Sequence, residues 1–458
     1  MKKSIKIISL LALITMLAII VISCGTGVKF NNLIGGNTSG GNGGSGGSGG
    51  NQGFVLFFDG NFENDYESFS SIVPTSDGGY FIVGRAQDYT QNPAIDDALF
   101  VKLNQNLEVQ WSKLGSIGII GTFGFENIEN GNNYYYACGY ANNGFFISKL
   151  NSYGSTNTII YFDNYVNFML PHSTGIIANL NSNIGSESAG PGIAKFDYDL
   201  NNKWYITNIY WGQANTITST NETVGYYKNT STSGFLVKLN VSYNSFSNDL
   251  ISQYASIYNN NSNDLYFLGS IKDDSNNFYF GFIDYRSGSD TYYLIKTGSN
   301  LEKSKEVSFS GDFNVSLVPV PNSNNVILGL YDKNNNYLVL VKLDSNLDVN
   351  TASQVKISNF NSYNPNHNIM YFTPLTNYFL VPGTYSNNGL IYTFDYNLNP
   401  ACGSPSSSNL ILQNTNYFNI DTTPISTPAL QSGSITVNIQ NTDTTDYQLT
   451  TMNACPIN

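Results

Sequence analysis

Residues 74–84 read Pro-Thr-Ser-Asp-Gly-Gly-Tyr-Phe-Ile-Val-Gly, and residues 100–104 read Phe-Val-Lys-Leu-Asn. In both stretches a short run of apolar and aromatic residues is bounded by Gly, Asp, Ser or Asn, which is typical of a β-strand that ends in a tight turn. Both stretches recur along the chain. Recurrence of a strand pattern at a fixed period indicates a repeat architecture, so these two motifs decide the fold.

The first motif is a strand that ends in glycine. Its copies lie about 50 residues apart on average, and one of them, at 175–178, is degenerate. Regular spacing of this kind predicts one structural unit per copy. The seven copies occupy residues 79–84, 134–139, 175–178, 222–225, 265–269, 325–329 and 378–383.

The second motif follows each first one, and most of its copies have a lysine at the centre. Its copies occupy residues 100–104, 147–151, 193–197, 236–240 and 340–344, with weaker ones at 280–284 and 391–395. Leucine recurs five positions after the Lys, or after the Thr that replaces it, and tryptophan recurs nine positions after the Lys: Leu107, Leu200, Leu347, Leu398, Trp111 and Trp204. These fixed offsets predict four strands per unit, namely one before the first motif, the two motifs, and one that carries the Leu or Trp.

Seven four-stranded units predict an all-β fold, a seven-bladed β-propeller over residues 54–403. A β-solenoid is the alternative, but its repeats are mostly about 20 to 30 residues long, shorter than the period here. The run 54–58 has the pattern of the last strand of a unit that has no other strand before it. We therefore expect this strand to complete the seventh blade and close the ring.

The first unit also carries a family resemblance. Residues 74–84, with 100–104 and Trp111, resemble the units of bacterial repeat lipoproteins, which read DGGY, VVG and KLD-x-NG followed by Trp. They resemble the delta-60 repeat less closely, and the later units have drifted from both patterns. The resemblance implies a secreted or surface β-propeller, and it implies no single activity.

The N-terminal segment 1–23 has the composition of a secretory signal peptide, since three lysines precede an apolar run that ends at Ile22. Residues 21–24 read Val-Ile-Ser-Cys, which resembles the lipobox of bacterial lipoproteins. That resemblance implies cleavage before Cys24, diacylglycerol on its thiol, and an acyl chain such as palmitate on its new amino group. Two alternatives stay open: an uncleaved membrane anchor, for which the run is at the short limit, and a secreted protein in which Cys24 is incidental.

Residues 24–53 follow as a stretch rich in Gly, Ser and Asn that has no apolar face to bury. This composition predicts a flexible tether with a root-mean-square reach of roughly 30 Å. Gly25 stands after the cysteine, where many inner-membrane lipoproteins have Asp. In a cell with two membranes this favours the outer membrane or the cell surface.

The chain carries few charges: the net charge is −12, and 11% of the residues are charged. Removal of segment 1–23 with its three lysines brings the net charge to about −15. No stretch clusters Lys and Arg, which argues against a nucleic-acid partner and against attachment to anionic lipid through a basic surface. The aromatic content of 14% argues against a disordered chain.

The C-terminal residues 404–458 are rich in Ser, Thr and Asn, and we expect a small appendage of β and irregular structure. Cys402 and Cys455 bracket residues 403–454, and disulfides persist in exported proteins, so we expect a bridge between them. Cys138 lies in a strand motif and is expected to be a small buried side chain. The chain has two histidines and no Cys-x-x-Cys pair, so no zinc site is predicted.

Asn and Asp alternate in the turn after the second motif, at 104–108, 197–201, 344–348 and 395–399. The spacing imitates the start of a calcium loop, but Asn208 and Val355 stand where the glutamate of the twelfth position is needed. Asx side chains that bond to their own backbone explain the pattern without a metal. Residues 75–79 similarly match only the opening of an Asp-box turn, and we expect an ordinary hairpin turn there.

No catalytic, cofactor or metal residue is assigned, because no pair can be chosen among 32 acidic residues and no nucleophile motif accompanies a histidine. Clustered tyrosines such as 134–136 either stack on sugars or pack between blades. The sequence thus predicts a membrane-anchored surface lipoprotein that displays a propeller with a non-enzymatic binding or structural role and a glycan or protein ligand. The alternative is a propeller enzyme, a hydrolase or lyase, that acts on extracellular polysaccharide.

Overall fold

The structure is a computed structural model of the whole chain. The chain forms two compact units, 1–40 and 41–458, and the first lies wholly outside the residues that are described. Described are residues 55–60, 65–88, 95–115, 120–141, 144–162, 165–181, 192–207, 209–210, 222–228, 233–259, 265–284, 290–358, 360, 370–385, 388–401, 406–407, 410–423, 428, 431–432, 438–440, 444–446 and 448–453.

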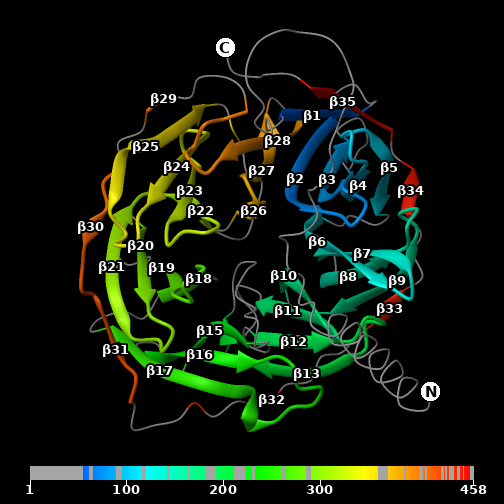
Figure 1. The fold of residues 1–458 in the computed structure, drawn as a ribbon. Helices are drawn as coiled ribbons and strands as arrows, with labels where there is room; N and C mark the ends of the chain where they lie inside the picture. The colour runs from blue at the N-terminus through cyan, green and yellow to red at the C-terminus, as the bar shows by residue number, and fades with distance from the viewer. Residues whose placement is uncertain are drawn as a thin grey trace, which may run out of the picture. The chain divides into compact units, whose positions relative to one another are not determined.

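The second unit consists of seven antiparallel sheets of five strands each, which follow one another around a ring (Figure 1). We number the sheets as blades and give their strands from the ring axis outward. Blade 1 contains β2 (Asp65–Pro74), β3 (Tyr80–Asp88), β4 (Ile95–Leu103), β5 (Val109–Gly115) and β34 (Thr444–Asp446). Blade 2 contains β6 (Ile120–Glu129), β7 (Asn132–Ala141), β8 (Gly144–Leu150), β9 (Thr156–Phe162) and β33 (Asn438–Gln440).

Blades 3 to 5 continue in the same order. Blade 3 contains β10 (Tyr165–His172), β11 (Gly175–Asn181), β12 (Gly192–Phe196), β13 (Asn202–Thr207) and β32 (Gln431–Ser432). Blade 4 contains β14 (Ile209–Tyr210), β15 (Glu222–Lys228), β16 (Ser233–Asn240), β17 (Ile251–Asn259) and β31 (Phe418–Asp421), with a short 3-10 helix, η2 (Asn248–Leu250), before β17. Blade 5 contains β18 (Leu265–Lys272), β19 (Phe278–Asp284), β20 (Thr291–Thr297), β21 (Lys303–Ser310) and β30 (Gln413–Asn414).

Blades 6 and 7 complete the ring. Blade 6 contains β22 (Phe313–Pro319), β23 (Val326–Asp332), β24 (Tyr337–Leu343), β25 (Val349–Ser358) and β29 (Ser406–Ser407). Blade 7 contains β26 (Thr373–Pro374), β27 (Tyr378–Tyr385), β28 (Asn388–Asp395), β1 (Val55–Gly60) and β35 (Leu449–Asn453). The chain is therefore a seven-bladed β-propeller, as the repeat predicts.

The ring is closed by the N-terminal strand. β1 is the fourth strand of blade 7 and pairs antiparallel with β28, with Val55 opposite Tyr392 and Phe58 opposite Gly389. This confirms the prediction that the run 54–58 completes the last blade. The first and last blade strands of the chain thus share one sheet, so blade 7 cannot form until both ends of the propeller sequence are present.

The two motifs occupy the second and third strands in six of the seven blades. In blade 5 the prediction is wrong by one strand, because 265–269 lies in the innermost strand β18 and 280–284 lies in β19. The true second motif of this blade is β20, where Lys296 is followed five positions later by Leu301. Both inner strands are buried aromatic runs, so an apolar run that contains glycine does not distinguish them. The offset from Lys to Leu does.

That offset has a conformational cause. The leucine is the fourth residue of a tight turn, and at five of the seven blades it adopts a left-handed backbone with φ between 60° and 66°. In the turn of blade 6, Leu347 N donates to Asp344 O at 3.0 Å, and Asp344 N donates to Asp348 O at 3.1 Å. Leucine is an uncommon choice at positive φ. Its side chain is nevertheless needed, because Leu347 is 1% exposed and packs in the core between blades.

The alternating Asx residues stabilise these turns by side-chain to backbone hydrogen bonds. The Oδ1 atom of Asp344 accepts from Asn346 N at 2.7 Å and from Asp348 N at 3.0 Å, and Asn104, Asn151, Asp197 and Asp395 accept in the same way in their blades. The interpretation that these side chains bond to their own backbone is thereby confirmed. The turn at 75–79 is a hairpin turn too, in which Asp77 accepts from Thr75 Oγ1 at 2.6 Å and Gly79 N at 3.1 Å.

The C-terminal segment differs from the expected appendage. Its seven short strands each add a fifth strand to a different blade, in the order 6, 5, 4, 3, 2, 1 and 7, and Figure 1 shows them along the outer side of the ring. We call this segment, 406–453, the belt. Its strands are two to five residues long, too short for any periodic pattern, and they are extended because an unpaired sheet edge is available at each blade.

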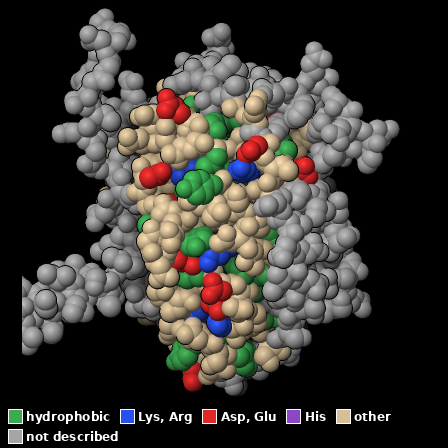
Figure 2. Space-filling model, turned by 90° about the vertical axis from the view of Figure 1, so that its right-hand side faces the viewer, with side chains coloured by type: hydrophobic (Ala, Val, Ile, Leu, Met, Phe, Trp, Pro, Cys, Tyr) green, Lys and Arg blue, Asp and Glu red, His purple; other side chains and the backbone are tan. Residues whose placement is uncertain are grey.

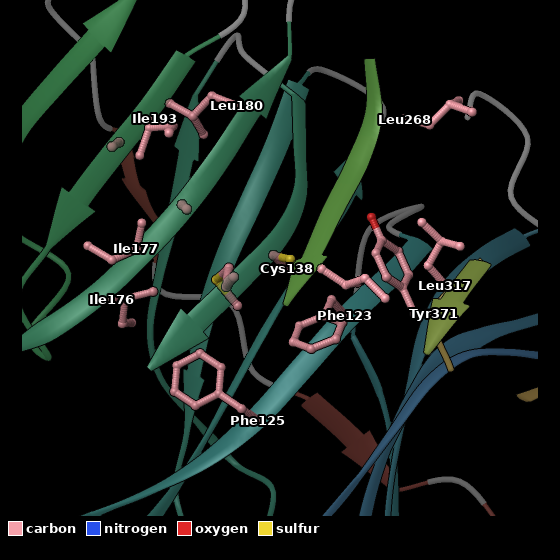
Figure 3. Close-up of a cluster of buried hydrophobic side chains, with 14 of the residues drawn as sticks. Phe123, Phe125, Cys138, Ile176, Ile177, Leu180, Ile193, Leu268, Leu317 and Tyr371 are labelled. Atoms are coloured by element: carbon pink, nitrogen blue, oxygen red, sulfur yellow. The ribbon is translucent and has the colours of Figure 1, made fainter. Parts of the chain in front are cut away.

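The core lies between neighbouring blades. One large cluster runs from Val73 in blade 1 to Leu347 in blade 6, and Figure 3 shows part of it around Phe123 and Cys138. Cys138 is 0% exposed on β7, as predicted for a small buried side chain. Tyr136 of blade 2 is fully buried, its ring lies 5.8 Å from the ring of Tyr198 in blade 3, and its OH donates to Tyr198 O at 2.7 Å, so this part of the tyrosine run packs between blades.

Candidate functional site

The three predicted modification sites, Cys24, Cys402 and Cys455, lie outside the described residues. Residues close to the two C-terminal cysteines are described, and both are held in blade 7. Ala401 N donates to Thr393 O of β28 at 2.9 Å, and Asn453 of β35 pairs with Leu56 of β1. Leu56 in turn pairs with Ile391 of β28.

The recurrent lysine of the second motif joins one blade to the next. In blades 2 to 6 its ammonium group donates to the turn between the third and fourth strands of the following blade. The acceptors are Tyr198 O at 2.9 Å for Lys149, Val241 O at 2.8 Å for Lys195, Ser299 O for Lys238, Ser345 O at 2.7 Å for Lys296, and Asn397 Oδ1 at 3.3 Å for Lys342. The constant spacing of this motif within the chain is therefore explained by ring assembly.

Blade 1 makes the same connection with its tryptophan. Lys102 binds Asp77 of its own blade at 2.8 Å, and Trp111 Nε1 donates to Ser152 O in the turn of blade 2 at 2.9 Å. Trp204 Nε1 likewise donates to Tyr243 O at 2.8 Å, beside Lys195. The two sequence markers, Lys and Trp, thus have one structural role, and neither is available as a ligand contact.

Lys195 yields a pH-dependent prediction. Burial lowers the pKa of its ammonium group from 10.5 to about 8, although three backbone carbonyls of the next blade accept from it. Between pH 8 and 10.5 the unfolded chain holds a proton that the folded protein has lost. The free energy of unfolding therefore rises with pH across this window, by roughly 1 to 3 kcal/mol from this group.

The variant Lys195→Met lacks this proton and serves as the comparison. The difference in unfolding free energy between the wild-type protein and Lys195→Met, measured by urea unfolding at pH 7.5, 9 and 10.5, is expected to move in favour of the wild type as pH rises. Parallel pH profiles of the two proteins would contradict the depressed pKa.

Apolar side chains from the inner strands of several blades are buried near the ring axis. Phe123 of blade 2 meets Tyr371, which precedes the inner strand of blade 7, with ring centroids 5.5 Å apart, and Leu268 and Leu317 belong to the same buried cluster (Figure 3). All four side chains are at most 7% exposed. These four side chains belong to the core and are not available to a ligand.

Blade 7 has a short inner strand. Like β14 of blade 4, β26 has two described residues, whereas the inner strands of blades 1 and 6 have ten and seven. The segment before β26 crosses to both neighbours instead: Met370 N donates to Val315 O of blade 6 at 2.8 Å, and Thr373 Oγ1 donates to Ile72 O of blade 1. In the described chain, β26 pairs with β27 only at Leu380 and Phe379.

Pro382 lies on β27 beyond the two pairs of that strand with β26, and none of the described residues pairs with β27 on its inner side there. Leu375 N donates to Tyr378 O, so Tyr378 directs its backbone groups toward the axis, and by the period of two Pro382 does the same. Proline lacks the N–H of a ladder bond and is found in strands mainly at edges. A proline in the middle of a buried strand motif is thus a sequence signal that could have indicated this irregular edge.

Two polar side chains of blade 6 each have a buried oxygen atom without a hydrogen-bond partner among the described residues. Asn314 and Ser316 lie on β22 and are 2% and 1% exposed, and Asn314 Oδ1 and Ser316 Oγ make no hydrogen bond. They share a sheet face with Tyr331 and Gly329, their cross-strand neighbours, and that face packs toward blade 7. Buried amide and hydroxyl groups are normally satisfied, so each such group needs an explanation.

A tyrosine pair extends the group toward blade 1. Burial, with the nearby phenol of Tyr66 and the carboxylate of Asp332, raises the pKa of Tyr331 to about 12. Tyr331 OH donates to Asn336 Oδ1 at 2.9 Å, and the Arg85 guanidinium lies 5.2 Å from the Tyr66 ring centre. We call Asn314, Ser316, Tyr331 and Tyr66 the blade 7 edge site. It combines neutral hydrogen-bonding groups with aromatic rings.

Other features of the described residues offer less for chemistry. No group of three His, Cys, Asp or Glu side chains in the described ranges is placed to hold a metal ion, and no helix there is long and apolar enough to cross a membrane. On the side of the ring that Figure 2 presents, Lys, Arg, Asp and Glu are scattered among uncharged polar groups, and no broad basic area is visible.

Comparisons with known proteins identify no family for this chain. No protein-family model matches the chain, and no curated protein matches it. Among solved structures the chain is similar to one described as dihydro-heme d1 dehydrogenase NirN in complex with DHE, with 10% sequence identity, a TM-score of 0.38, and coverage of 79% of this chain and 76% of that chain. A likeness this distant carries no argument about activity, and the assignment as a seven-bladed propeller rests on the strand pairing.

Proposed function

We propose that this chain is a lipid-anchored surface protein whose propeller binds a neutral, hydroxyl-bearing ligand, such as a glycan, without chemical conversion. The observation that carries the binding role is the pair Asn314 and Ser316 on the face of blade 6 toward blade 7, which are buried and whose Oδ1 and Oγ atoms have no hydrogen-bond partner among the described residues. Leaving a buried polar group unsatisfied costs about 1 to 3 kcal/mol. Such a cost is expected where a group is kept for function and not for stability.

The chemistry of the group favours a sugar. Asn314 Oδ1 is an acceptor and a serine hydroxyl is both donor and acceptor, which match the hydroxyls of a pyranose, and the phenol of Tyr331 lies on the strand opposite Asn314. A peptide strand is a poorer fit, because Pro382 removes one N–H from the edge to which it would add. The groups without partners are uncharged, which favours a neutral ligand over an acidic one.

Binding is tested with a glycan array that carries neutral and acidic oligosaccharides, probed with the wild-type protein and with Asn314→Leu. The wild type is expected to bind neutral glycans, and Asn314→Leu is expected to lose at least tenfold in affinity while its melting temperature stays equal or rises, because a buried unsatisfied amide is removed. Asn346→Leu, on an exposed turn of the same blade, is the matched control. Absence of array binding, or equal binding by Asn314→Leu, would refute the site.

The membrane anchor rests on residues 21–24 and on the tether that follows them. Two or more acyl chains hold a protein stably on a bilayer, since each buried methylene contributes about 0.8 kcal/mol. We expect mass spectrometry of the mature protein to find an N-terminal Cys24 with diacylglycerol and an amide-linked acyl chain. Cys24→Ser should appear in the soluble exported fraction, and an unmodified Cys24 or a retained Met1 would contradict the anchor.

We also propose that Cys402 and Cys455 form a disulfide that joins the belt to blade 7. Ala401 and Asn453, which lie close to them in the sequence, are both held in that blade, on β28 and β1. Closing a loop of about 50 residues stabilises by roughly 4 kcal/mol on the chain-entropy estimate. Alkylation of the denatured protein is expected to modify both cysteines only after reduction, and modification of both before reduction would exclude the bridge.

A further inference from the structure

The strand that receives the tether is held on both sides. β1 begins at Val55, directly after the Gly- and Ser-rich segment, and pairs with β28 at four residues and with β35 at five. Every other fourth strand of the ring is bonded on its outer side to a belt strand of two to four residues. The longest belt strand therefore lies on the one blade strand that continues into the tether.

The side chains of β1 are as firmly held as its backbone. Val55, Leu56 and Phe58 are 2%, 2% and 0% exposed. Phe58 meets Phe69 of blade 1 edge to face, with ring centroids 4.7 Å apart, so the strand is packed against the next blade as well. Withdrawal of β1 thus requires the loss of two hydrogen-bond ladders and a buried aromatic contact.

We propose that β1 and β35 form a mechanical clamp, by which tension on the tether is resisted at the point where it enters the propeller. The inference rests on the proposed function in one respect, namely that the propeller is held through its N-terminal segment. It does not depend on which ligand binds or on whether the anchor is a lipid. The last strand of the belt, β35, forms the second set of hydrogen bonds to β1. The other six belt strands attach the rest of the belt, and thereby β35, to the other blades. The belt then resists force in addition to covering sheet edges.

The strand directions decide how the clamp bears force. β1 is antiparallel to both neighbours, and Val55, at its tether end, lies opposite Tyr392, while Leu56 lies opposite Asn453. A pull on Val55 along the strand, with the body held at the far end of the ring, loads all pairs of both ladders at once. A pull between Val55 and the C-terminus starts at the neighbouring ends of β1 and β35 and opens the pairs one after another.

This difference allows a test on the full-length protein by optical tweezers. For the first geometry the handles are at residue 24 and at Ser310→Cys. Ser310 is exposed and is the last residue of β21, the fourth strand of blade 5. Because β21 runs in the same direction as β1, this handle lies at the end of the ring opposite Val55. For the second geometry the handles are at residue 24 and at the C-terminus. We expect the force of the first rupture to be severalfold higher in the first geometry, because forced unfolding follows the barrier and simultaneous loading raises it.

A truncated chain tests the role of β35, and all chains are pulled under reducing conditions so that the proposed Cys402–Cys455 bridge does not contribute. A stop after Asp446 removes β35 and leaves four of nine registered pairs on β1, so the rupture force in the first geometry is expected to fall by about half. A stop after Cys455 is the control and should behave as the full chain. Equal forces in the two geometries, or an unchanged force after the stop at Asp446, would overturn the clamp, whereas failure of glycan binding or of lipidation would leave these forces as they are.

Discussion

A chain that ends at Gly403 is expected to lose the stable propeller and to aggregate. All seven fourth strands would then present unpaired edges, which pair readily with other chains. In blade 5 the loss is specific. The carboxylate of Glu306, which is 2% exposed, accepts from Thr415 Oγ1 and Tyr417 N at 2.7 Å and from Phe418 N at 3.1 Å. Without the belt it keeps Lys303 alone, and each lost hydrogen bond to a charged group contributes about 1.5 to 3 kcal/mol.

Phe418 contributes a second large loss at the same place. Its ring is 0% exposed and lies 5.1 Å from Phe282 and 5.4 Å from Tyr293, centroid to centroid. Removal of a buried phenylalanine costs about 3 to 5 kcal/mol. The free energy lost at Phe418 and at Glu306 together is comparable to the whole free energy of unfolding of an ordinary domain, about 5 to 15 kcal/mol.

The measurement is size-exclusion chromatography with thermal unfolding of three chains: full length, stopped after Gly403 and stopped after Cys455. The chain stopped after Cys455 keeps every belt strand, so its elution volume and melting temperature should equal those of the full-length protein. The single variant Phe418→Ala should lower the melting temperature by several degrees while the protein stays monomeric. A monomeric chain stopped after Gly403, with an unchanged melting temperature, would show that the belt is not part of the stable fold.

The second large effect is expected at ring closure. Phe58→Ala should lower the free energy of unfolding by about 3 to 5 kcal/mol, because it empties a fully buried site between blades 7 and 1. Phe58→Asp should do more, since it places an unpaired charge there and removes the packing that holds β1 in its blade.

Urea unfolding of both variants is the measurement, and Tyr153→Ala is the control, because the Tyr153 side chain is 76% exposed and its removal should change stability by less than about 0.5 kcal/mol. If Phe58→Ala also falls within that range, β1 does not close the ring in the way the pairing indicates.

Much of the ring follows from residues that recur at fixed offsets. Lys195 and Leu200 are recognisable in the sequence because each has one geometric task, a bond to the next blade and a left-handed turn. The strand 54–58 is recognisable as well, because a lone fourth strand before the first unit has only one blade to complete. Where two neighbouring strands share the same aromatic character, as β18 and β19 do, the pattern places the motif one strand too early.

The belt is not recognisable as strands, and the blade 7 edge site is not recognisable as a site. Residues 406–453 carry no period, since two to five residues per blade are too few to show one. Asn314 and Ser316 read as ordinary strand residues, and nothing in their local sequence shows that the facing inner strand is short.

Local chemistry alone therefore determined the repeat, the turns and the number of blades, because strand alternation, Asx turns and the Lys-to-Leu offset act within one unit. Tertiary structure decided which edges remained open and what covered them. An edge exists only once the ring has formed, so the path of the belt and the unpartnered groups beside β27 depend on contacts between residues far apart in the chain.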